Sequence, residues 1–537
     1  MRVKSRAMAI ASISAVALFA TACGGSSDSD STSGGTAGGE IISGGCNPEN
    51  PLVAGNTAET CGGDVLDVLT AKLIHYNPET AEPENDIAES IETKDNQTFT
   101  VKIKKGYKFH DGTEVLAKNF VDAWNYTAFG PNGQQGGYFF EPVEGFKEVS
   151  DPKSKVKELT GLKVVDDLTF TIKTTTPVSN LPLRLGYTAF APQPDSFFDD
   201  PEAFGKKPVA AGPYKFDSWE ENSAIAVSKF DDYSGDFGGN ADKITFQIFQ
   251  DADAEYTALL AGEIDVVRQI PPSALIDNKF QTDLGDGRYL EKENSTFQFV
   301  GMNYNVDPKL KNVKVRQAIS MAIDRPTIVK QIFNDAYTPA TGWVSPVVDG
   351  YKAGACGEYC EFNPEKAKQL LGEGGGYDGK LTLSYNGDGG HKEWTQAVCN
   401  SVKKSIGIDC VATPSVDFKT ILTKLGKDEV KGLFRMGWVM DYPSIENYLS
   451  PIYGATASSN YYGYDNAEFQ KTMSEAGAAE TPEEANKLYQ QAEGLIAKEF
   501  TTIPLWYGKT IIGWSDKVTE VKATPFGSPD LAAMKVK

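Results

Sequence analysis

The first residues of the chain determine where the rest of it folds. Three basic residues precede an apolar stretch from Ala7 to Ala22, and Cys23 follows directly. A basic start, a short apolar run and small residues at its end are typical of an export signal that is removed. The stretch is shorter than the roughly 20 apolar residues that a membrane-spanning helix needs. We therefore expect residues 1–22 to be a signal peptide and the mature chain to fold outside the cytoplasm.

The sequence around Cys23 predicts a lipid anchor. The segment Ala20-Thr21-Ala22 before Cys23 resembles the lipobox of bacterial lipoproteins, in which the cysteine is acylated, although Leu is usual at the place of Ala20. Residues 24–45 are almost entirely Gly, Ser, Thr, Ala and Asp, and such a composition buries too little apolar surface to offset the entropy of ordering. We expect residues 23–45 to be a lipidated cysteine with a flexible tether, anchored to the outer face of the cell membrane. The alternative is a freely secreted protein with a disordered N-terminus.

The other six cysteines form three pairs that are close in sequence. Outside the cytoplasm such pairs are normally disulfides, and we expect Cys46–Cys61, Cys356–Cys360 and Cys399–Cys410. A structural zinc site needs four ligands close together. Because no second pair lies beside Cys356–Cys360 and the three histidines are scattered, no metal is expected.

Length and charge limit the classes of protein to consider. The mature chain from Cys23 to Lys537 is too long for one hydrophobic core and predicts two or three domains. The formal net charge of the whole chain is −21, and removal of the basic signal makes the mature protein more acidic. Such a surface repels nucleic acid, so no nucleic-acid partner is expected.

Apolar periodicity predicts a mixed fold. Residues 99–103, 168–172 and 244–248 alternate as half-buried strands do, whereas residues 315–323 carry one apolar stripe at helical spacing. Residues 381–412 predict a strand, a helix and a second strand, which together form a βαβ unit. The sequence therefore predicts an α/β protein with sheets in more than one domain.

Catalytic motifs are missing from the sequence. It contains neither Gly-x-Ser-x-Gly nor His-Glu-x-x-His. Residues 374–380 approach the phosphate-binding loop pattern, but Leu381 stands where a Ser or Thr must hold magnesium. A glycine-rich turn that leads into a strand is the better interpretation, and we expect neither an enzyme nor a cofactor.

A series of segments, in order along the chain, carries a resemblance to a known family. They are residues 87–90, 98–102 and 108–113, then 211–214 with Trp219, 260–265, 315–325 and 503–506. With these segments the chain resembles the extracytoplasmic oligopeptide- and dipeptide-binding proteins of bacterial ABC importers, solute-binding protein family 5.

The resemblance implies a two-lobed α/β fold of the periplasmic-binding-protein kind (type II, cluster C), with an extra domain inserted in the first lobe. The implied parts are lobe I (46–75, 185–298 and 506–537), the inserted domain (76–184) and lobe II (299–505).

The resemblance also implies ligand-binding residues. Asp441 occupies the place of the aspartate that pairs with the ligand's α-ammonium, and a buried ammonium needs such a partner. Arg435 and His391 fall where relatives meet the ligand's carboxylate, and Phe418 falls where they place an aromatic side chain near a pocket. Trp438 and Tyr442 belong to the same segment as Asp441 and are counted with these residues.

Each of these residues also has a structural explanation. Asp441 would cap a turn, Arg435 would pair with a surface acid, His391 would open a helix and Phe418 would belong to the core.

The implied function is binding and delivery. The lobes would close about hinge strands near residues 298 and 505 onto an oligopeptide, and the monomer would then dock on a permease served by separate ATPase subunits. The membrane would be touched only through the lipid. The alternative cargoes are a nickel complex, haem, glutathione or an oligosaccharide, and the less expected classes are a secreted enzyme or an adhesin.

The sequence differs from many relatives at one place, and this difference leaves the class of ligand open. Many relatives carry Glu-Gly before the leucine that corresponds to Leu73, whereas this chain has Ala71-Lys72. Peptide length, side-chain preference and a nutrient or signalling role are not determined by the sequence.

Overall fold

The computed structural model describes residues 38–57, 59–249, 251–387, 390–416, 418–455, 457 and 459–537. The expected signal peptide, Cys23 and residues 24–37 lie outside the described residues. Among the helices of the described part, none has both the length and the apolar character needed to cross a membrane.

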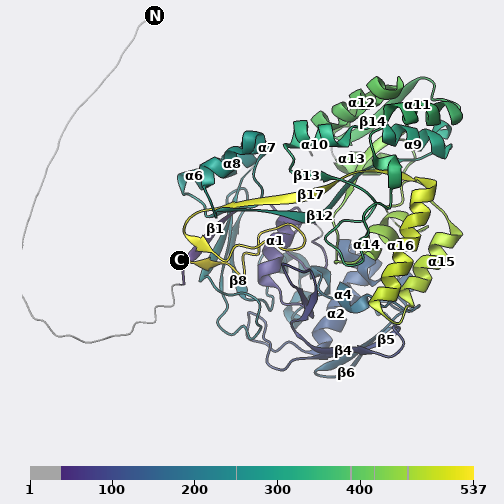
Figure 1. The fold of residues 1–537 in the computed structure, drawn as a ribbon. Helices are drawn as coiled ribbons and strands as arrows, with labels where there is room; N and C mark the ends of the chain where they lie inside the picture. The colour runs from purple at the N-terminus through teal and green to yellow at the C-terminus, as the bar shows by residue number, and fades with distance from the viewer. Residues whose placement is uncertain are drawn as a thin grey trace, which may run out of the picture. The chain divides into compact units, whose positions relative to one another are not determined.

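A large mixed sheet runs through the described residues (Figure 1). It contains 11 strands, and β13 pairs with β17 beside the main path. In spatial order the strands are β15 (Asp409–Ser415), β14 (Lys380–Asn386), β16 (Leu433–Trp438), β12 (Tyr289–Met302), β17 (Thr502–Trp514), β11 (Val266–Val267), β1 (Glu40–Gly45), β10 (Lys243–Ile248), β9 (Ala224–Lys229) and β8 (Tyr214–Glu220), with β13 (Tyr337–Pro339).

The two long strands at the centre, β12 and β17, connect the two halves of this sheet (Figure 1). They pair antiparallel from Tyr289 opposite Gly513 to Gly301 opposite Thr502. Their register shifts between Gln298 and Phe299, which pair with Trp506 and Pro504. Such a bulge bends a strand locally, and it falls where the hinge is expected.

Three smaller sheets complete the strands of the described residues. Their strands are β4 (Ala88–Thr93), β5 (Thr98–Ile103), β7 (Thr169–Lys173) and β6 (Leu162–Asp166) in one sheet, β2 (Ile74–Tyr76) and β3 (Pro83–Asn85) in another, and β18 (Val518–Thr519) and β19 (Lys535–Val536) in the third. The strands expected over residues 99–103, 168–172 and 244–248 are confirmed as β5, β7 and β10.

The α-helices lie between the strands in sequence. They are α1 (Thr60–Leu69), α2 (Ala117–Ala128), α3 (Phe146–Val149), α4 (Leu181–Arg184), α5 (Pro201–Phe204), α6 (Ala252–Ala261), α7 (Pro272–Leu275), α8 (Lys279–Leu284), α9 (Val313–Met321), α10 (Arg325–Phe333), α11 (Pro364–Glu373), α12 (Lys392–Ile406), α13 (Phe418–Leu425), α14 (Glu446–Tyr453), α15 (Ala467–Gly477) and α16 (Pro482–Glu499).

The βαβ unit expected over residues 381–412 is confirmed as β14, α12 and β15. Helix α12 buries Trp394, Val398 and Val402, which are spaced four residues apart and therefore share one face. The helix ends at Gly407, whose φ of 77° is left-handed and costs glycine little. Strands β14 and β15 then pair in parallel.

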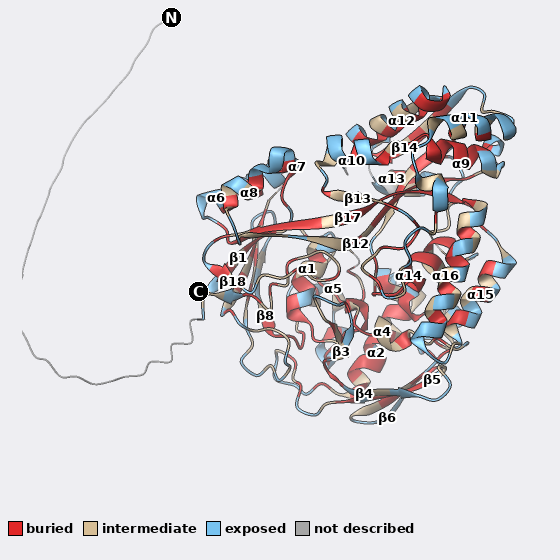
Figure 2. Cartoon of the chain, in the orientation of Figure 1, coloured by how far each residue is buried: buried red, intermediate tan, exposed pale blue. Residues whose placement is uncertain are grey.

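The buried hydrophobic residues form several separate cores. Figure 2 colours the buried residues red along the strands and helices. One core contains residues between Phe297 and Tyr507, and a second contains residues between Ala71 and Ala211 together with Tyr442. Two smaller cores lie around β1, β8–β10 and the C-terminal segment, and around α6–α8. The domain limits implied by the resemblance stay a prediction.

The expected tether is wrong at its C-terminal end. Residues Glu40–Gly45 form β1, which pairs in parallel with β10 and β11 inside the large sheet. Ile41 is fully buried, so this segment does bury apolar surface, which its glycine- and serine-rich surroundings in the sequence obscure.

Three disulfides join the cysteines in the expected pairs, Cys46–Cys61, Cys356–Cys360 and Cys399–Cys410. The first links the end of β1 to α1 and closes a 15-residue separation.

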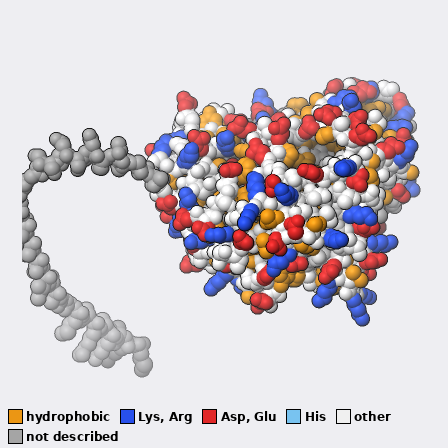
Figure 3. Space-filling model, turned by 90° about the horizontal axis from the view of Figure 1, so that it is seen from below, with side chains coloured by type: hydrophobic (Ala, Val, Ile, Leu, Met, Phe, Trp, Pro, Cys, Tyr) orange, Lys and Arg blue, Asp and Glu red, His pale blue; other side chains and the backbone are white. Residues whose placement is uncertain are grey.

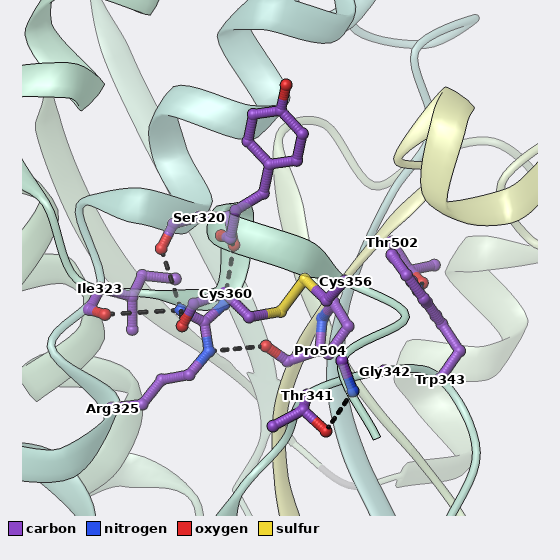
Figure 4. The surroundings of a disulfide bond; sticks show 12 residues. Ser320, Ile323, Arg325, Thr341, Gly342, Trp343, Cys356, Cys360, Thr502 and Pro504 are labelled. Atoms are coloured by element: carbon purple, nitrogen blue, oxygen red, sulfur yellow. Dashed lines mark hydrogen bonds between the residues drawn. A yellow bond between two sulfur atoms is a disulfide. The ribbon is translucent and has the colours of Figure 1, made fainter. Parts of the chain in front are cut away.

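Next to Cys356–Cys360 lies a fully buried guanidinium, that of Arg325 (Figure 4). It donates to the backbone oxygens of Pro504 at 2.8 Å and Cys360 at 3.2 Å, and to the hydroxyl of Ser320 at 2.7 Å. Burial lowers the pKa of Arg325 to about 9. Arg325 thus ties the disulfide segment to β17 near the bulge of β12.

Candidate functional site

One cavity of about 600 Å³ stands out in the structure. We call it the main cavity. It is lined by residues of α1 and the segments beside it (57–72), by residues 75–86, by residues 186–188 and 213–240, by the C-terminal segment 520–535 and by residues 439–441.

Of the residues expected to bind a ligand, Asp441 lines the main cavity. It follows β16 and lies half-buried. The amide of Asn447 donates to the carboxylate at 3.1 Å, while the Asn447 carbonyl oxygen accepts from the Asp441 backbone N–H at 2.8 Å. The same oxygen accepts from the Trp438 indole at 3.0 Å. Asn447 of α14 therefore fixes both Asp441 and Trp438.

The charge of Asp441 is poorly compensated. Burial raises the pKa of Asp441 to about 6; hydrogen bonds from Asn447 and Tyr138 and the charge of Arg184 lower it, whereas Glu446 raises it. Arg184 is itself paired with Glu446 at 3.1 Å. Within the described residues, no ion pair includes Asp441. A positively charged group that entered the cavity would therefore stabilise this carboxylate.

Tyr442 is placed differently from its neighbour. It is buried, and its hydroxyl donates to Glu446 at 2.6 Å. The Arg184 guanidinium lies 5.0 Å from the centre of its ring. Tyr442 is not among the residues that line the main cavity, and its role as a ligand contact stays a prediction.

Arg435, Phe418 and His391 are not among the residues that line the main cavity. Arg435 on β16 donates to Gln298 at 3.3 Å and to Asn386 at 3.4 Å, and its guanidinium lies 5.5 Å from the centre of the Phe418 ring. His391 precedes α12 and accepts a hydrogen bond from the Trp394 indole at 3.0 Å. The structure thus brings Arg435 and Phe418 together, but it does not bring these residues to the cavity that Asp441 lines.

The lining contributed by α1 was not expected from the sequence. Thr60, Gly63, Asp64, Asp67 and Val68 line the cavity, and their spacing of three and four residues places them on one face of the helix. This spacing was a signal in the sequence, but a polar helix face is more often solvated. Only the fold places the C-terminal segment opposite it.

Two polar contacts connect Asp64 of α1 to segments distant in the sequence. Asp64 accepts from Arg268 at 2.9 Å and from the Ser528 hydroxyl at 2.6 Å. Burial raises the pKa of Asp64, and the charge of Arg268 lowers it. Ser528 belongs to the C-terminal segment, so Asp64 holds that segment against the helix.

Lys72, part of the departure noted in the sequence, also lines the cavity. Its ammonium lies 3.1 Å from the carboxylate of Asp67 in α1. The departure therefore adds a cation to the cavity wall, and that cation is engaged by an acid of α1.

Comparisons with known proteins agree with this architecture. The family model described as "Bacterial extracellular solute-binding proteins, family 5 Middle" matches residues 82–460, which is more than half of the chain. The oligopeptide-binding protein OppA of Bacillus subtilis is 25% identical over 469 residues, covering 85% of each chain. The heme-binding protein A of Haemophilus influenzae is 25% identical over 481 residues, covering 85% of this chain and 84% of its own.

A solved structure shows the same fold. The crystal structure of Haemophilus influenzae OppA in complex with RPPGFSPFR matches with a TM-score of 0.77 at 22% identity, covering 93% of this chain and 99% of that one. The expected two-lobed α/β class is confirmed. Proteins of this family bind solutes and are not enzymes. The chain belongs to the bacterial extracellular solute-binding proteins of family 5, which serve ABC importers.

Proposed function

We propose that this protein captures oligopeptides in the main cavity, anchors their amino terminus at Asp441 and delivers them to the permease of an ABC importer. The observation that carries the proposal is the half-buried carboxylate of Asp441 in the cavity wall, where burial raises its pKa to about 6. A peptide with a free amino terminus brings an ammonium at neutral pH.

Physical reasoning supports this pairing. A charged amino terminus that leaves water loses several kcal/mol of hydration unless an opposite charge meets it. Asp441 is held in place by Asn447 at 3.1 Å and therefore needs little reorganisation to accept a ligand. The printed name of the B. subtilis relative, an oligopeptide-binding protein, supports the same cargo.

Asp441→Ala is the direct test. We expect it to weaken the binding of free peptides by 10-fold or more, because a desolvated ammonium then loses its partner at a cost of about 2 kcal/mol or more. N-acetylated peptides should bind poorly to the parent protein. Calorimetric titration with alanine peptides of two to nine residues measures both effects and the preferred length.

A matched control keeps the interpretation clear. Asp409→Asn removes an exposed carboxylate on β15 that pairs with Lys403 at 2.7 Å, and it should leave peptide binding unchanged. Equal binding of free and acetylated peptides would contradict the anchor role. Binding of haem but of no peptide, as the name of the second relative suggests for that protein, would contradict the peptide cargo.

We further propose that Cys23 carries a lipid that holds the protein at the outer face of the membrane. The lipobox-like segment before Cys23 supports this. Mass spectrometry of the mature N-terminus tests it, since a diacylglyceryl cysteine at residue 23 is expected, and an unmodified N-terminus would contradict the anchor.

A further inference from the structure

Negatively charged side chains outnumber positively charged ones in the lining of the main cavity. On the outer face shown in Figure 3, Lys and Arg side chains are interspersed with Asp and Glu. In the cavity wall the carboxylates outnumber the lysines: the acids are Glu59, Asp64, Asp67, Glu84, Asp86, Asp236, Asp441, Glu520 and Asp530, and the lysines are Lys72, Lys522 and Lys535.

The cations of the wall offset little of this charge. Lys72 pairs with Asp67 at 3.1 Å, and Lys522 pairs at 2.8 Å with Glu79, which does not line the cavity. His75 stacks on the ring of Phe237 with centroids 4.0 Å apart. Burial lowers the pKa of His75 to about 4, so this ring is uncharged at neutral pH.

Two carboxylates line the cavity together with Lys72. Asp67 of α1 pairs with the Lys72 ammonium at 3.1 Å, and Asp530 belongs to the C-terminal segment. Burial raises the pKa of Asp530 above its ordinary value, and the backbone N–H of Ala533 opposes this shift. Among the nearby charges, Asp67 raises this pKa further, whereas Lys522 and Lys72 lower it. Asp67, Lys72 and Asp530, which we call the α1 triad, therefore carry a net negative charge.

Two tyrosine rings line the same cavity as the α1 triad and Asp441. Tyr76 and Tyr187 both line the cavity. Burial raises their pKa above its ordinary value, and the charges of Asp441 and Asp67 raise it further in both tyrosines. Tyrosine rings attract cations, and the carboxylates of the same cavity add to this attraction.

The arrangement favours an organic cation over a metal ion. In the part of the chain that the structure describes, no group of three or more His, Cys, Asp or Glu side chains is arranged to hold a metal. A guanidinium, in contrast, pairs with carboxylates and stacks on tyrosine rings at the same time.

We propose that the main cavity selects cationic peptides, in which a Lys or Arg side chain binds at the α1 triad while the amino terminus lies at Asp441. This inference rests on the proposed peptide function and adds a side-chain preference to it. A peptide with an acidic side chain at the same position meets Asp67 and Asp530 as like charges and is rejected.

The test uses the shortest alanine peptide that binds the full-length mature protein. Arginine, citrulline or glutamate replaces each alanine in turn, and calorimetry at pH 7.5 measures affinity. At one position at least, we expect arginine to bind 10-fold or more tightly than citrulline, which has nearly the same shape without the charge. Glutamate at that position should bind 10-fold or more weakly than alanine.

Substitutions in the α1 triad should change the ratio of arginine-peptide to citrulline-peptide affinity, and the acids and the lysine should change it in opposite directions. Asp67→Asn and Asp530→Asn should each lower the arginine-to-citrulline ratio at least threefold, whereas Lys72→Gln should raise it because it frees Asp67. Asp409→Asn, at a residue that does not line the cavity, should leave the ratio unchanged. Circular dichroism confirms that each variant is folded.

Two outcomes overturn the inference in different ways. If arginine and citrulline peptides bind equally at every position while the alanine peptide binds, the cationic preference is wrong and the peptide function stands. If no peptide of any composition binds, both are wrong.

Discussion

Asn447 holds Asp441 and Trp438 through one side-chain amide, with distances of 3.1 Å and 3.0 Å to these two side chains. Tyr138, Arg184 and Glu446 complete the charged and titratable groups that act on Asp441. These groups orient the carboxylate without neutralising it. At the scale of single residues, the site therefore keeps an unpaired charge in the free protein, and this charge should be measurable through its pH dependence.

Peptide affinity should fall as the pH drops below about 6. The pKa of Asp441 is raised by burial to about 6, and only the ionised form attracts an ammonium. Below that pH the affinity should fall by up to tenfold per unit, because each unit corresponds to about 1.4 kcal/mol. Titration calorimetry from pH 4.5 to 8 tests this, and a flat profile would contradict a role for the Asp441 charge.

The raised pKa of Asp441 also predicts how the stability of the peptide-free protein changes with pH. Because the native pKa of about 6 is above the ordinary 3.8, the native state holds this proton more tightly than the unfolded state does, and the group lowers stability as pH rises through this window. Asp441→Asn should therefore stabilise the peptide-free protein at pH 7.5 by at most about 3 kcal/mol, and have little effect below pH 4. A lower melting temperature of the variant at pH 7.5 would contradict this.

Helix α1 shows how one element serves two purposes. Glu59 caps its start by accepting from the Gly62 N–H at 2.9 Å, and Val65, Leu66 and Leu69 are buried in a core. The opposite side carries Asp64 and Asp67 into the cavity wall. The disulfide Cys46–Cys61 fixes the first turn of the helix to the end of β1, so it positions the cavity wall as well as the fold.

The disulfides should differ in their contribution to stability. In the chain-entropy model a cross-link over 15 residues contributes about 3 kcal/mol and one over 4 residues about 2 kcal/mol. Replacing Cys46 and Cys61 together by Ser should therefore lower the free energy of unfolding more than the same change at Cys356 and Cys360. Denaturant unfolding measures both. The reverse order would show that Cys356–Cys360 acts mainly through the native contacts around Arg325.

The two largest parts of the molecule are connected at more than one place. Strands β12 and β17 run through both halves of the large sheet. Far from them in sequence, Arg184 pairs with Glu446 at 3.1 Å, the Ser179 N–H donates to the Gly477 carbonyl at 2.8 Å, and Asn96 donates to the Ala479 carbonyl at 2.8 Å. These contacts connect the part that contains the core of residues 71–211 to the part that contains the core of residues 297–507. We infer that they form when the two parts close.

Arg184→Met should shift the molecule towards an open form. Loss of the mostly buried Arg184 leaves Glu446 without its ion pair, and such a loss costs about 3–5 kcal/mol. Small-angle scattering should show a larger radius of gyration without peptide, and peptide affinity should fall. The exposed pair of Lys173 with Glu144 at 3.1 Å offers a control, since Lys173→Met should change neither. An unchanged radius in Arg184→Met would show that the contact is not part of closure.

Local patterns gave much of the fold. The alternation at residues 99–103 and 244–248 predicted β5 and β10, and the apolar stripe of residues 315–323 predicted α9, because burial of one face imposes a period on the sequence. The expectation for residues 40–45 failed because two isoleucines among small residues carry too weak a pattern, and only pairing with β10 makes them a strand.

The sequence by itself determined the cysteine pairs, the α/β class and the family, since each depends on residues that are close together or on segments matched in order. It also predicted Asp441 as a ligand contact, and Asp441 lines the main cavity. Only the tertiary structure decided which other side chains share a cavity with that carboxylate. Asp67 and Asp530 are separated by most of the chain, and they line one cavity because the C-terminal segment contacts α1 through Ser528 and Asp64. Contacts between distant segments depend on the packing of the whole chain, and no local pattern records them.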